Sequence, residues 1–230
     1  MKTGAIIVGA GEGRRMGGRE KLLHPLGSDP LLAVTVRAFQ DHPGIGGIVL
    51  VAGDRVREWF QSELREKYGL SKVIAAVGGG PRRQDSVHIG LQAFPTPPEF
   101  VLIHDGDRPF VTGKVISAVL KACSGGGAIA AVAVKDTVKR VDSGGVITDT
   151  PRRRELRLAQ TPQGFPFPVI LAAHEEARRR GWEVTDDSAL AERAGIRVRV
   201  VEGSYDNIKI TTPEDLILAE AIYSRRRNKN

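Results

Sequence analysis

Residues 4–21 read GAIIVGAGEGRRMGGREK, an apolar run that passes directly into a glycine-rich, basic segment. The run Gly4–Val8 contains β-branched residues and no charge, which is typical of a strand buried on both faces. Glycine lets the backbone turn at positive φ and brings N–H groups close to a bound anion. We therefore expect a buried strand followed by an anion-binding loop.

Outward from this segment, apolar strand patterns and helical patterns alternate along the first two thirds of the chain. Strands are expected at Gly4–Val8, Gly47–Ala52, Lys72–Val77, Phe100–His104 and Ala128–Val134. Helices are expected at Leu31–Gln40, Asp54–Lys67, Gln84–Ala93 and Lys114–Ala122. Such alternation favours right-handed βαβ crossovers, and hence an α/β fold with a doubly wound, mostly parallel sheet of the Rossmann-like type.

Residues 136–157 break this alternation with two adjacent glycines, Pro151 and a cluster of arginines. Because compact domains use short connections, an insertion this long is usually functional or disordered, and we expect a protruding arm. Beyond it the sequence predicts helices near Pro168–Arg180 and Asp187–Ala194, a strand at Arg197–Val201 and a last helix beginning at Pro213. No repeat or linker divides the chain, so we expect residues 1–230 to form one domain.

The composition is that of an ordinary globular protein, with 41% hydrophobic and 27% charged residues among 230. Cys123 is the only cysteine, which excludes an intramolecular disulfide framework and a cysteine-based zinc site. The longest apolar run, Ala128–Val134, is far shorter than the roughly 20 residues that span a bilayer. Glycines follow the first apolar run too early for a signal peptide, so we expect a cytoplasmic protein with no membrane partner.

The formal net charge is +7 and the sequence pI is near 9.8, values that raise nucleic acid as a partner. The positive charge is concentrated in residues 9–21 (net +2), 135–157 (net +3) and 225–229 (net +4). Aromatic residues, which single-strand binders interleave with basic ones, are only 5% of the chain and do not accompany these clusters. We therefore expect no nucleic-acid partner, and we expect residues 225–229 to be a solvated, frayed terminus.

The glycine-rich loop fits neither of two familiar phosphate-binding motifs. A dinucleotide fingerprint needs G-x-G-x-x-G, but Arg14 stands where the third glycine would follow Gly9 and Gly11. A Walker loop needs Gly-Lys-Ser/Thr, which does not occur in the chain. The loop instead carries its own cations, Arg15 and Lys21. This arrangement suits a triphosphate whose transferred phosphoryl group gains charge in the transition state.

The predicted strand at residues 100–104 ends in the acidic sequence HDGDRP, residues 104–109. Open α/β sheets bind ligands at the carboxyl ends of their strands. Mg²⁺ takes few protein ligands and completes its shell with water and substrate phosphate oxygens, so Asp105 is the first candidate ligand and Asp107 the second. Arg108 is suited to a phosphate, and we expect His104 to be a hydrogen-bonded part of the scaffold.

Seven segments together resemble the 2-C-methyl-D-erythritol 4-phosphate cytidylyltransferases of the non-mevalonate isoprenoid pathway. They are the glycine loop through Met16 and Lys21, Gly79–Gly80 with Arg83, Ser86 and Val87, His104–Asp105 with Arg108–Pro109, Val134–Thr137, Gln160–Phe165, Thr185–Asp187, and Glu202–Gly203 with Asn207–Thr211. That family couples CTP with a sugar-alcohol phosphate, giving a CDP-alcohol and pyrophosphate. The resemblance implies the same substrates here, together with Mg²⁺ or another divalent cation.

The resemblance also implies residue functions. Arg15, Lys21 and Lys209 match the catalytic cations, and Asp105 matches the metal ligand. The nucleotide-binding positions are matched by Gly9, Ala10, Gly11, Gly13, Gly80 and Ser86. The positions that hold methylerythritol phosphate are matched by Arg108, Thr137, Arg153, Thr161 and Thr185. The family supplies the arginine matched by Arg153 from a partner subunit, so we expect a homodimer with residues 136–157 as a contact.

Three positions depart from the family pattern. Glu20 replaces a common proline before Lys21, and a carboxylate there is a possible partner for that lysine. Asp107 stands where the family usually has alanine, which puts a second carboxylate beside the metal ligand. Pro81 follows Gly80 and has no N–H to offer a base.

Two other functions, one enzymatic and one of nucleic-acid binding, compete with this interpretation. A ribitol 5-phosphate cytidylyltransferase shares the glycine loop and the segments near Thr161 and Lys209, but the segments at Gly79–Val87 and Thr185–Asp187 favour the methylerythritol enzyme. A nucleic-acid-binding protein would use the basic arm and tail, and its binding would fall steeply with salt.

Overall fold

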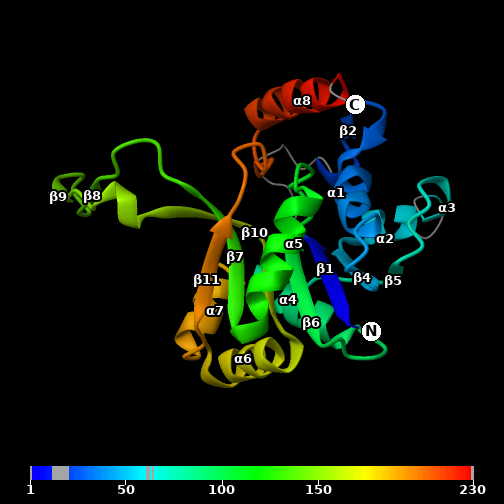
Figure 1. Cartoon of the computed structure of the whole chain (residues 1–230), viewed down its shortest axis with the longest axis horizontal. Helices are drawn as coiled ribbons and strands as arrows, with labels where there is room; N and C mark the ends of the chain where they lie inside the picture. Colours follow the sequence, from blue (N-terminus) through cyan, green and yellow to red (C-terminus); the bar gives the residue numbers. More distant parts are fainter. Residues whose placement is uncertain (1, 12–20, 61–62, 64, 229–230) are drawn as a thin grey trace.

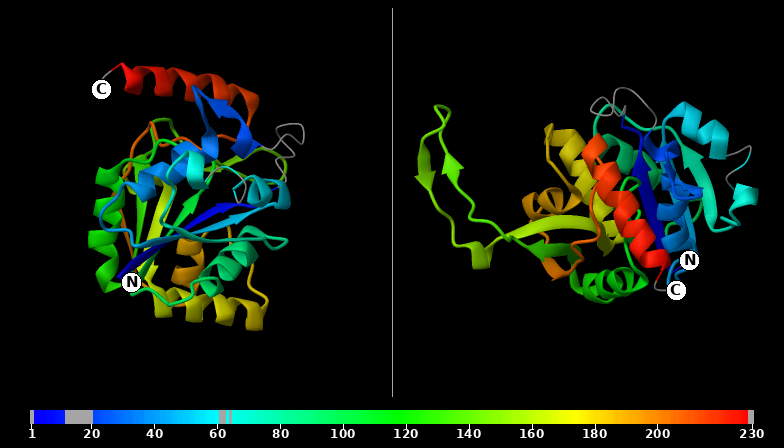
Figure 2. Two further views of the ribbon diagram at one scale, coloured as in Figure 1. Left: turned by 90° about the vertical axis from the view of Figure 1, so that its right-hand side faces the viewer. Right: turned by 90° about the horizontal axis from the view of Figure 1, so that it is seen from above.

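A computed structural model of the chain describes residues 2–11, 21–60, 63 and 65–228. These residues form a seven-stranded sheet in the order β11–β7–β10–β6–β1–β4–β5, with helices on both faces (Figures 1 and 2). The strands are β1 (Thr3–Gly9), β4 (Gly47–Ala52), β5 (Val73–Val77), β6 (Phe100–Asp105), β7 (Gly127–Ala133), β10 (Arg157–Pro166) and β11 (Val198–Glu202). The helices are α1 (Leu31–Gln40), α2 (Asp54–Trp59), α3 (Arg65–Lys67), α4 (Arg83–Gln92), α5 (Gly113–Ala122), α6 (Phe167–Arg180), α7 (Asp187–Arg193) and α8 (Pro213–Arg227).

The expected doubly wound, mostly parallel α/β sheet is confirmed. β1 lies between β4 and β6 and is parallel to both, β5 extends the sheet beside β4, and β11 is parallel to β7. Only β10, among the strands of this sheet in the described residues, runs antiparallel to its neighbours. The single helix expected over residues 54–67 is described as α2 and α3, with residues 61, 62 and 64 outside the description.

Successive side chains of the central strands enter two different hydrophobic cores. In β1, Ala5 and Ile7 face one core, which includes apolar residues of α1, α5 and α8, whereas Ile6 faces a second core lined by α4, α6 and α7. The period of two in a strand sends neighbouring side chains to opposite faces. A strand with apolar side chains on both faces therefore needs helices on both sides of the sheet. The polar residues at its carboxyl end then lie at the edge of the sheet, beyond these helices.

Strand β10 was not expected as a strand. It pairs with β7 up to Ala159 and again from Gln163, with a bulge between these positions. Pro162 lies inside the bulge, where its missing N–H removes no regular ladder bond. The polar sequence Gln160–Gln163 looks like a turn, yet all four of these residues are buried in the centre of the sheet.

The arm begins after β7 and returns into β10. Its outer part is a hairpin of β8 (Arg140–Val141) and β9 (Ile147–Asp149), whose residues are all exposed. Figures 1 and 2 show this hairpin extending well away from the sheet and its helices. A two-stranded hairpin is at best marginally stable in water, so the arm has little packing of its own to hold it.

The expectation of a frayed basic tail was wrong for the residues that the structure describes. Helix α8 starts at the predicted Pro213 and continues to Arg227. Near its end, Arg225 Nη2 donates to Asp206 Oδ1 at 2.6 Å, and Arg226 Nη2 donates to the carbonyl of Phe110 at 2.9 Å. These contacts bind the tail to the loop before α8 and to the segment between β6 and α5, which is why its charge is not simply solvated.

In the described part of the chain, no helix combines the length and the apolar character that crossing a membrane requires.

Candidate active site

The carboxyl ends of β1 and β6 meet at one edge of the sheet. Val8 is paired in register with Asp105, and the Gly106 N–H donates to the Val8 carbonyl at 2.7 Å. The first residues of the glycine loop therefore lie beside the acidic turn that follows β6. This is the adjacency that a parallel pair of strands produces from two segments almost a hundred residues apart.

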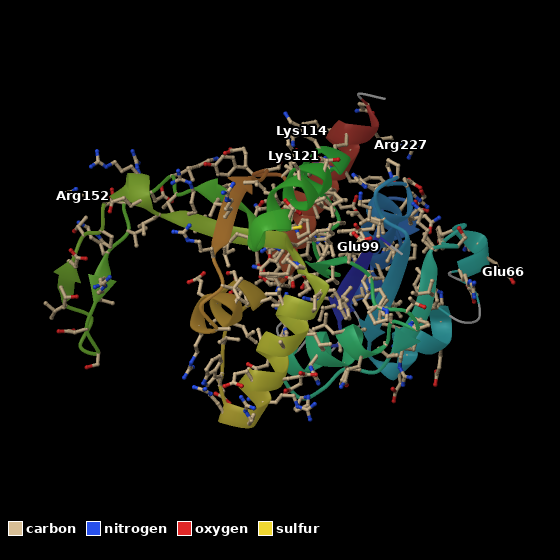
Figure 3. The ribbon with its side chains drawn as sticks, turned by 60° about the horizontal axis from the view of Figure 1, so that its bottom comes forward. Glu66, Glu99, Lys114, Lys121, Arg152 and Arg227 are labelled. Atoms are coloured by element: carbon tan, nitrogen blue, oxygen red, sulfur yellow. The ribbon has the colours of Figure 1, made fainter. Side chains whose placement is uncertain are left out.

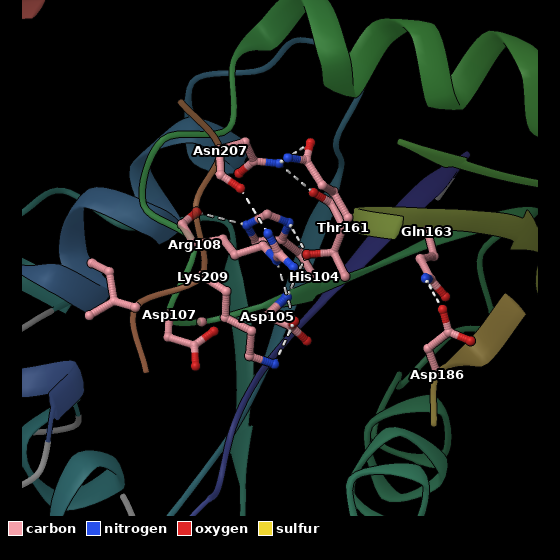
Figure 4. A network of polar contacts seen from close by, with 12 residues as sticks. His104, Asp105, Asp107, Arg108, Thr161, Gln163, Asp186, Asn207 and Lys209 are labelled. Carbon is pink, nitrogen blue, oxygen red and sulfur yellow. Dashed lines mark hydrogen bonds and ion pairs between the residues drawn. The ribbon is translucent and has the colours of Figure 1, made fainter. Parts of the chain in front are cut away.

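Asp105 is the centre of the charge cluster at this edge. Its carboxylate contacts Arg83 Nε at 3.1 Å, Lys209 Nζ at 2.9 Å and Arg108 Nε at 3.5 Å. Burial alone would raise the pKa of Asp105, but the charges of Arg83, Lys209 and Arg108 outweigh it and hold the pKa well below its ordinary value. The aspartate is therefore an anion in a cationic cradle. Figure 4 shows Asp105 between Lys209 and Arg108.

Arg83 connects this cluster to a second buried anion. Its Nη1 donates to Asp187 Oδ2 at 2.7 Å, and His174 Nε2 contacts the other oxygen of Asp187 at 3.2 Å. Burial alone would raise the pKa of Asp187. The charge of Arg83 and the hydrogen bond from His174 outweigh this effect, so the pKa of Asp187 lies below its ordinary value. Arg83 thereby joins α4, β6 and α7, and its two anions keep it in one orientation.

His104 and Thr161 support Asp105 from inside the protein. Both ring nitrogens of His104 form hydrogen bonds. Nδ1 lies 2.9 Å from Thr161 Oγ1, and Nε2 lies 3.0 Å from the Arg108 carbonyl. Burial lowers the pKa of His104 to about 4, so the ring is neutral at pH 7. Because a carbonyl only accepts, Nε2 carries the proton and Nδ1 accepts from Thr161. Thr161 Oγ1 in turn accepts the Asp105 N–H at 3.0 Å.

This tautomer confirms the expected scaffold function of His104. It also commits the hydroxyl proton of Thr161 to the histidine. Thr161 is 4% exposed, so it lies beneath the charge cluster, and the contact with substrate implied by the family remains a prediction for this residue.

Replacing Thr161 with valine should lower the free energy of unfolding by about 2–4 kcal/mol, since each buried polar group left unsatisfied costs roughly 1–3 kcal/mol. Valine keeps the shape but leaves the Asp105 N–H and His104 Nδ1 without their partner. Thr161→Ser is the matched control, because it keeps the hydroxyl and loses only a methyl group. Urea unfolding of the three proteins measures the effect, and equal destabilisation by serine and valine would contradict it.

The loop before α8 brings Lys209 and Arg108 together. Asn207 is fully buried; its Nδ2 donates to the Thr161 carbonyl at 2.8 Å, and its own carbonyl accepts from Arg108 Nη1 at 2.8 Å. The Lys209 side chain is 36% exposed, whereas that of Arg108 is 12% exposed. Lys209 is thus the more exposed cation of the two, and Arg108 is held against the loop.

Lys21 approaches the same edge from the end of the glycine-rich segment. Its ammonium contacts Asp107 Oδ2 and donates to the Ile210 carbonyl at 3.1 Å. The anticipated partner of Lys21, Glu20, lies outside the described residues, as do the predicted site residues Gly13 and Arg15. The structure therefore places Lys21 beside Asp107, and says nothing of the loop that precedes it.

Those predicted nucleotide-binding residues that the structure describes lie at the neighbouring strand ends. A Cβ placed on Gly79 would lie 2.1 Å from the Cβ of Ala10 and 2.8 Å from Ser86 Oγ, so only glycine fits between them. Ser86 Oγ accepts the Gly80 N–H at 3.1 Å. Gly9 and Gly11 flank Ala10 on the β1 side. The structure brings Ala10, Gly80 and Ser86 together around Gly79, whereas Gly13 lies outside the described residues. The positions were assigned by resemblance, and their binding function remains a prediction.

Three predicted substrate-binding residues lie outside the cluster around Asp105. Thr137 and Arg153 are exposed on the arm, where Arg153 Nη1 donates to the Lys135 carbonyl at 2.6 Å. Thr185 is exposed just before α7. Within the described residues, no hydrogen bond or ion pair joins any of these three to Asp105.

Sequence reasoning did not assign site functions to Arg83, Asp187 or Asn207. All three residues stand in the segments that carry the family resemblance, and Asp187 also begins a predicted helix. Two charged residues about a hundred positions apart give no local sign that they pair. A buried ion pair of this kind is visible only once α4 and α7 are packed against the same face.

The carboxylates at this edge fit a divalent cation of the magnesium type. No group of three or more His, Cys, Asp or Glu that could hold a metal occurs among the described residues. Asp105 supplies hard oxygen at the sheet edge, and Asp107 Oδ1 is buried and without a hydrogen-bond partner in the described residues. One or two carboxylates combined with substrate phosphate oxygens is the arrangement that Mg²⁺ prefers.

A model of the 2-C-methyl-D-erythritol 4-phosphate cytidylyltransferase family, IspD, matches residues 3–225. The chain belongs to this family. It is 46% identical over 218 residues to the enzyme of that name from Bacillus mycoides, covering 94% of this chain and 95% of the relative. It is also 46% identical over 229 residues to the enzyme of that name from a Nostoc species, covering 97% of this chain and 98% of the relative.

A longer relative matches as well. The chain is 48% identical over 222 residues to the bifunctional enzyme IspD/IspF of Desulforudis audaxviator, and the match covers 96% of this chain and 56% of that protein. Among solved structures, 4-diphosphocytidyl-2C-methyl-D-erythritol synthase from Anaerococcus prevotii is 33% identical, with a TM-score of 0.86 and coverage of 97% of this chain and 96% of that chain. These comparisons confirm the nucleotidyltransferase fold and family membership, and they do not support the ribitol phosphate alternative.

Proposed function

We propose that this cytidylyltransferase couples CTP with 2-C-methyl-D-erythritol 4-phosphate and releases pyrophosphate. The observation that carries the proposal is the gathering of Lys21, Arg108 and Lys209 around the carboxylates of Asp105 and Asp107, at the sheet edge. An edge with this many cations suits the meeting of a triphosphate and a phosphate monoester, which repel one another in solution.

The reaction needs positioning and charge stabilisation, and no covalent intermediate with the protein. An anionic oxygen of the alcohol phosphate attacks the α-phosphorus of CTP, a new P–O bond forms, and the bond to pyrophosphate breaks. Lys21 would neutralise the α-phosphate and the leaving group, and Lys209 would leave Asp105 to contact the phosphates from the other side. Arg15 is assigned to the same task by resemblance. No proton transfer is required, which agrees with the neutral, fully bonded His104.

At the other end of the substrate, Ala10, Gly80 and Ser86 would face the cytosine. Ala10 packs so closely against Gly79 that a Cβ on Gly79 would collide with it. With no room for a larger side chain here, we propose that main-chain groups contact the base. Gly9, Gly11 and Gly13 belong to the same proposal, because residues without a side chain allow the main chain to approach the nucleotide.

The proposal includes Mg²⁺ or another divalent cation, with Asp105 as its protein ligand. When bound, such an ion neutralises charge on the phosphate oxygens. Arg83 helps to keep the Asp105 carboxylate charged, and Asp187 holds Arg83 in its orientation. Lys209, the more exposed neighbour of Asp105, is the group with the freedom to move toward a phosphate.

We also propose a homodimer in which the arm of each chain completes the site of the other. The arm carries exposed apolar side chains, including Val141, Val146 and Ile147, which are 54%, 64% and 57% exposed. Figure 3 shows Arg152, a neighbour of Arg153, on the arm and apart from the body of the protein. Exposed apolar clusters commonly mark contact surfaces, and a partner would give the arm the packing it lacks.

Mixing an Arg153→Ala chain with a Lys21→Ala chain should restore activity if the sites are shared. In the heterodimer, one of the two sites then contains both native residues, so about half the native kcat should return. The kcat of the heterodimer is measured after the two chains, which carry different tags, are purified together. In the matched control, an Arg154→Ala chain takes the place of the Arg153→Ala chain. Absence of rescue in verified heterodimers would mean that each site is built from one chain.

A cytoplasmic location and the absence of a membrane or nucleic-acid partner belong to the same proposal. They are supported by the assignment of the basic segments to a nucleotide and an arm, and by the pairing of Arg225 and Arg226 with the protein itself.

The substrate experiment is a comparison of two alcohol phosphates. Purified protein is incubated with CTP, Mg²⁺ and either 2-C-methyl-D-erythritol 4-phosphate or ribitol 5-phosphate, and pyrophosphate release is followed. We expect release with the methylerythritol compound. Release with ribitol 5-phosphate alone would overturn the proposed function.

A further inference from the structure

Asp107 occupies a buried position in direct contact with Lys21. Its side chain is 9% exposed, and Oδ2 accepts from the Lys21 ammonium. The same turn is tied to the loop before α8, because the Ile210 N–H donates to the Asp107 carbonyl at 3.0 Å. Lys21 in turn donates to the Ile210 carbonyl at 3.1 Å. Lys21, Asp107 and Ile210 therefore form a closed set of three contacts.

These contacts join three segments that each carry part of the proposed site. Lys21 follows the glycine-rich loop, Asp107 follows β6 two residues after Asp105, and Ile210 follows Lys209. A lysine side chain has four rotatable bonds and a compact charge, so its position is not defined by its own geometry. The carboxylate and the carbonyl occupy two of its three N–H donors, and the described residues supply no hydrogen-bond partner for the third.

We propose that Asp107 is a positioning residue that holds Lys21 at the phosphate-facing edge and offsets part of its charge. This inference rests on the proposed function for its effect on turnover. Holding the ammonium in place favours the transition state, where charge develops on the transferred phosphoryl group. The carboxylate also repels the triphosphate of bound CTP, which weakens ground-state binding. Removing it should therefore lower kcat and KM for CTP together.

Two substitutions separate the two effects. Asp107→Ala removes both the acceptor and the charge, and should lower kcat about tenfold, since a displaced group costs one to two orders of magnitude. KM for CTP should fall several-fold in the same variant. Asp107→Asn keeps an oxygen that accepts from Lys21, so it should retain kcat within about threefold while KM still falls. Asp41→Asn is the control, because Asp41 is exposed at the end of α1, away from the site.

A second measurement does not depend on catalysis. The rate at which a limiting amine-acylating reagent modifies Lys21 is followed by mass spectrometry in the folded, full-length variants. Loss of the carboxylate partner should raise this rate in Asp107→Ala and leave it unchanged in Asp41→Asn. Circular dichroism verifies that each variant is folded.

The proposal is wrong if Asp107→Ala leaves kcat, KM for CTP and the Lys21 acylation rate within twofold of the native values. It is also wrong if the only change is in the Mg²⁺ concentration needed for half-maximal activity, which would make Asp107 a metal ligand. If the native protein turns over neither alcohol phosphate, the proposed function fails, while the acylation rates still decide whether Asp107 holds Lys21.

Discussion

Replacing Lys21 with alanine should lower kcat by about 10²–10³-fold, the usual cost of removing one preorganised group from a developing charge. KM for CTP should change by only a few-fold. The reason is that Lys21 is neutralised by Asp107 before the reaction and its charge is needed most when the bond to pyrophosphate lengthens.

The single substitution also leaves Asp107 buried without its cation. The double variant Lys21→Ala/Asp107→Ala removes that second effect and is the matched control. Steady-state pyrophosphate release with CTP varied gives kcat and KM for all three proteins. If the double variant recovers native turnover, the loss in Lys21→Ala came from the unpaired carboxylate, and Lys21 has no catalytic function.

Replacing Asp105 with asparagine should remove almost all turnover and also destabilise the fold. Asparagine has the same shape but leaves Arg83, Arg108 and Lys209 without their shared anion. Removing one partner of a buried ion pair costs about 3–5 kcal/mol, and the exposed Lys209 recovers part of this by turning to solvent. If Asp105 holds the metal as proposed, its loss as a ligand should lower kcat by about 10³-fold or more.

Urea unfolding and pyrophosphate release measure the two consequences separately. Asp29→Asn is the control, because it breaks the more exposed pair of Asp29 with Arg37 and should change the free energy of unfolding by less than about 1 kcal/mol. A variant at Asp105 that is as stable as this control, and that regains native kcat at high Mg²⁺, would contradict the central position assigned to Asp105.

Local patterns in the sequence predicted the part of the fold that depends on periodicity. The uninterrupted apolar residues of β1 and β4 require burial on both faces, so the layered α/β arrangement follows from them. The same reasoning placed Asp105 at the carboxyl end of a central strand, and the pairing of β1 with β6 then showed that it lies beside the glycine loop. Residue functions for Lys21 and Lys209 came from the family resemblance, and the structure places both near the Asp105–Asp107 turn.

Strand β10 shows where periodicity fails. Its buried residues include Gln160, Thr161 and Gln163, polar side chains that normally indicate a turn. They are tolerated inside the sheet because each has a partner from another element: Gln160 Nε2 donates to the Ser204 carbonyl at 2.8 Å and Gln163 Nε2 to Asp186 Oδ2 at 2.8 Å. Figure 4 shows the latter pair. The sequence of β10 lacks the alternation of apolar residues that would predict a strand.

The sequence by itself determined the parallel strands, the layers and the edge of the sheet at which polar residues emerge, but not strand β10. Only the tertiary structure decided that Arg83 bridges Asp105 and Asp187, that Lys21 is held by Asp107, and that the basic tail is tied to Asp206. The physical reason is that burial patterns act between neighbours in the chain, whereas ion pairs form between residues 19 to 104 positions apart. Their choice of partner depends on which elements the packed sheet brings within hydrogen-bonding distance.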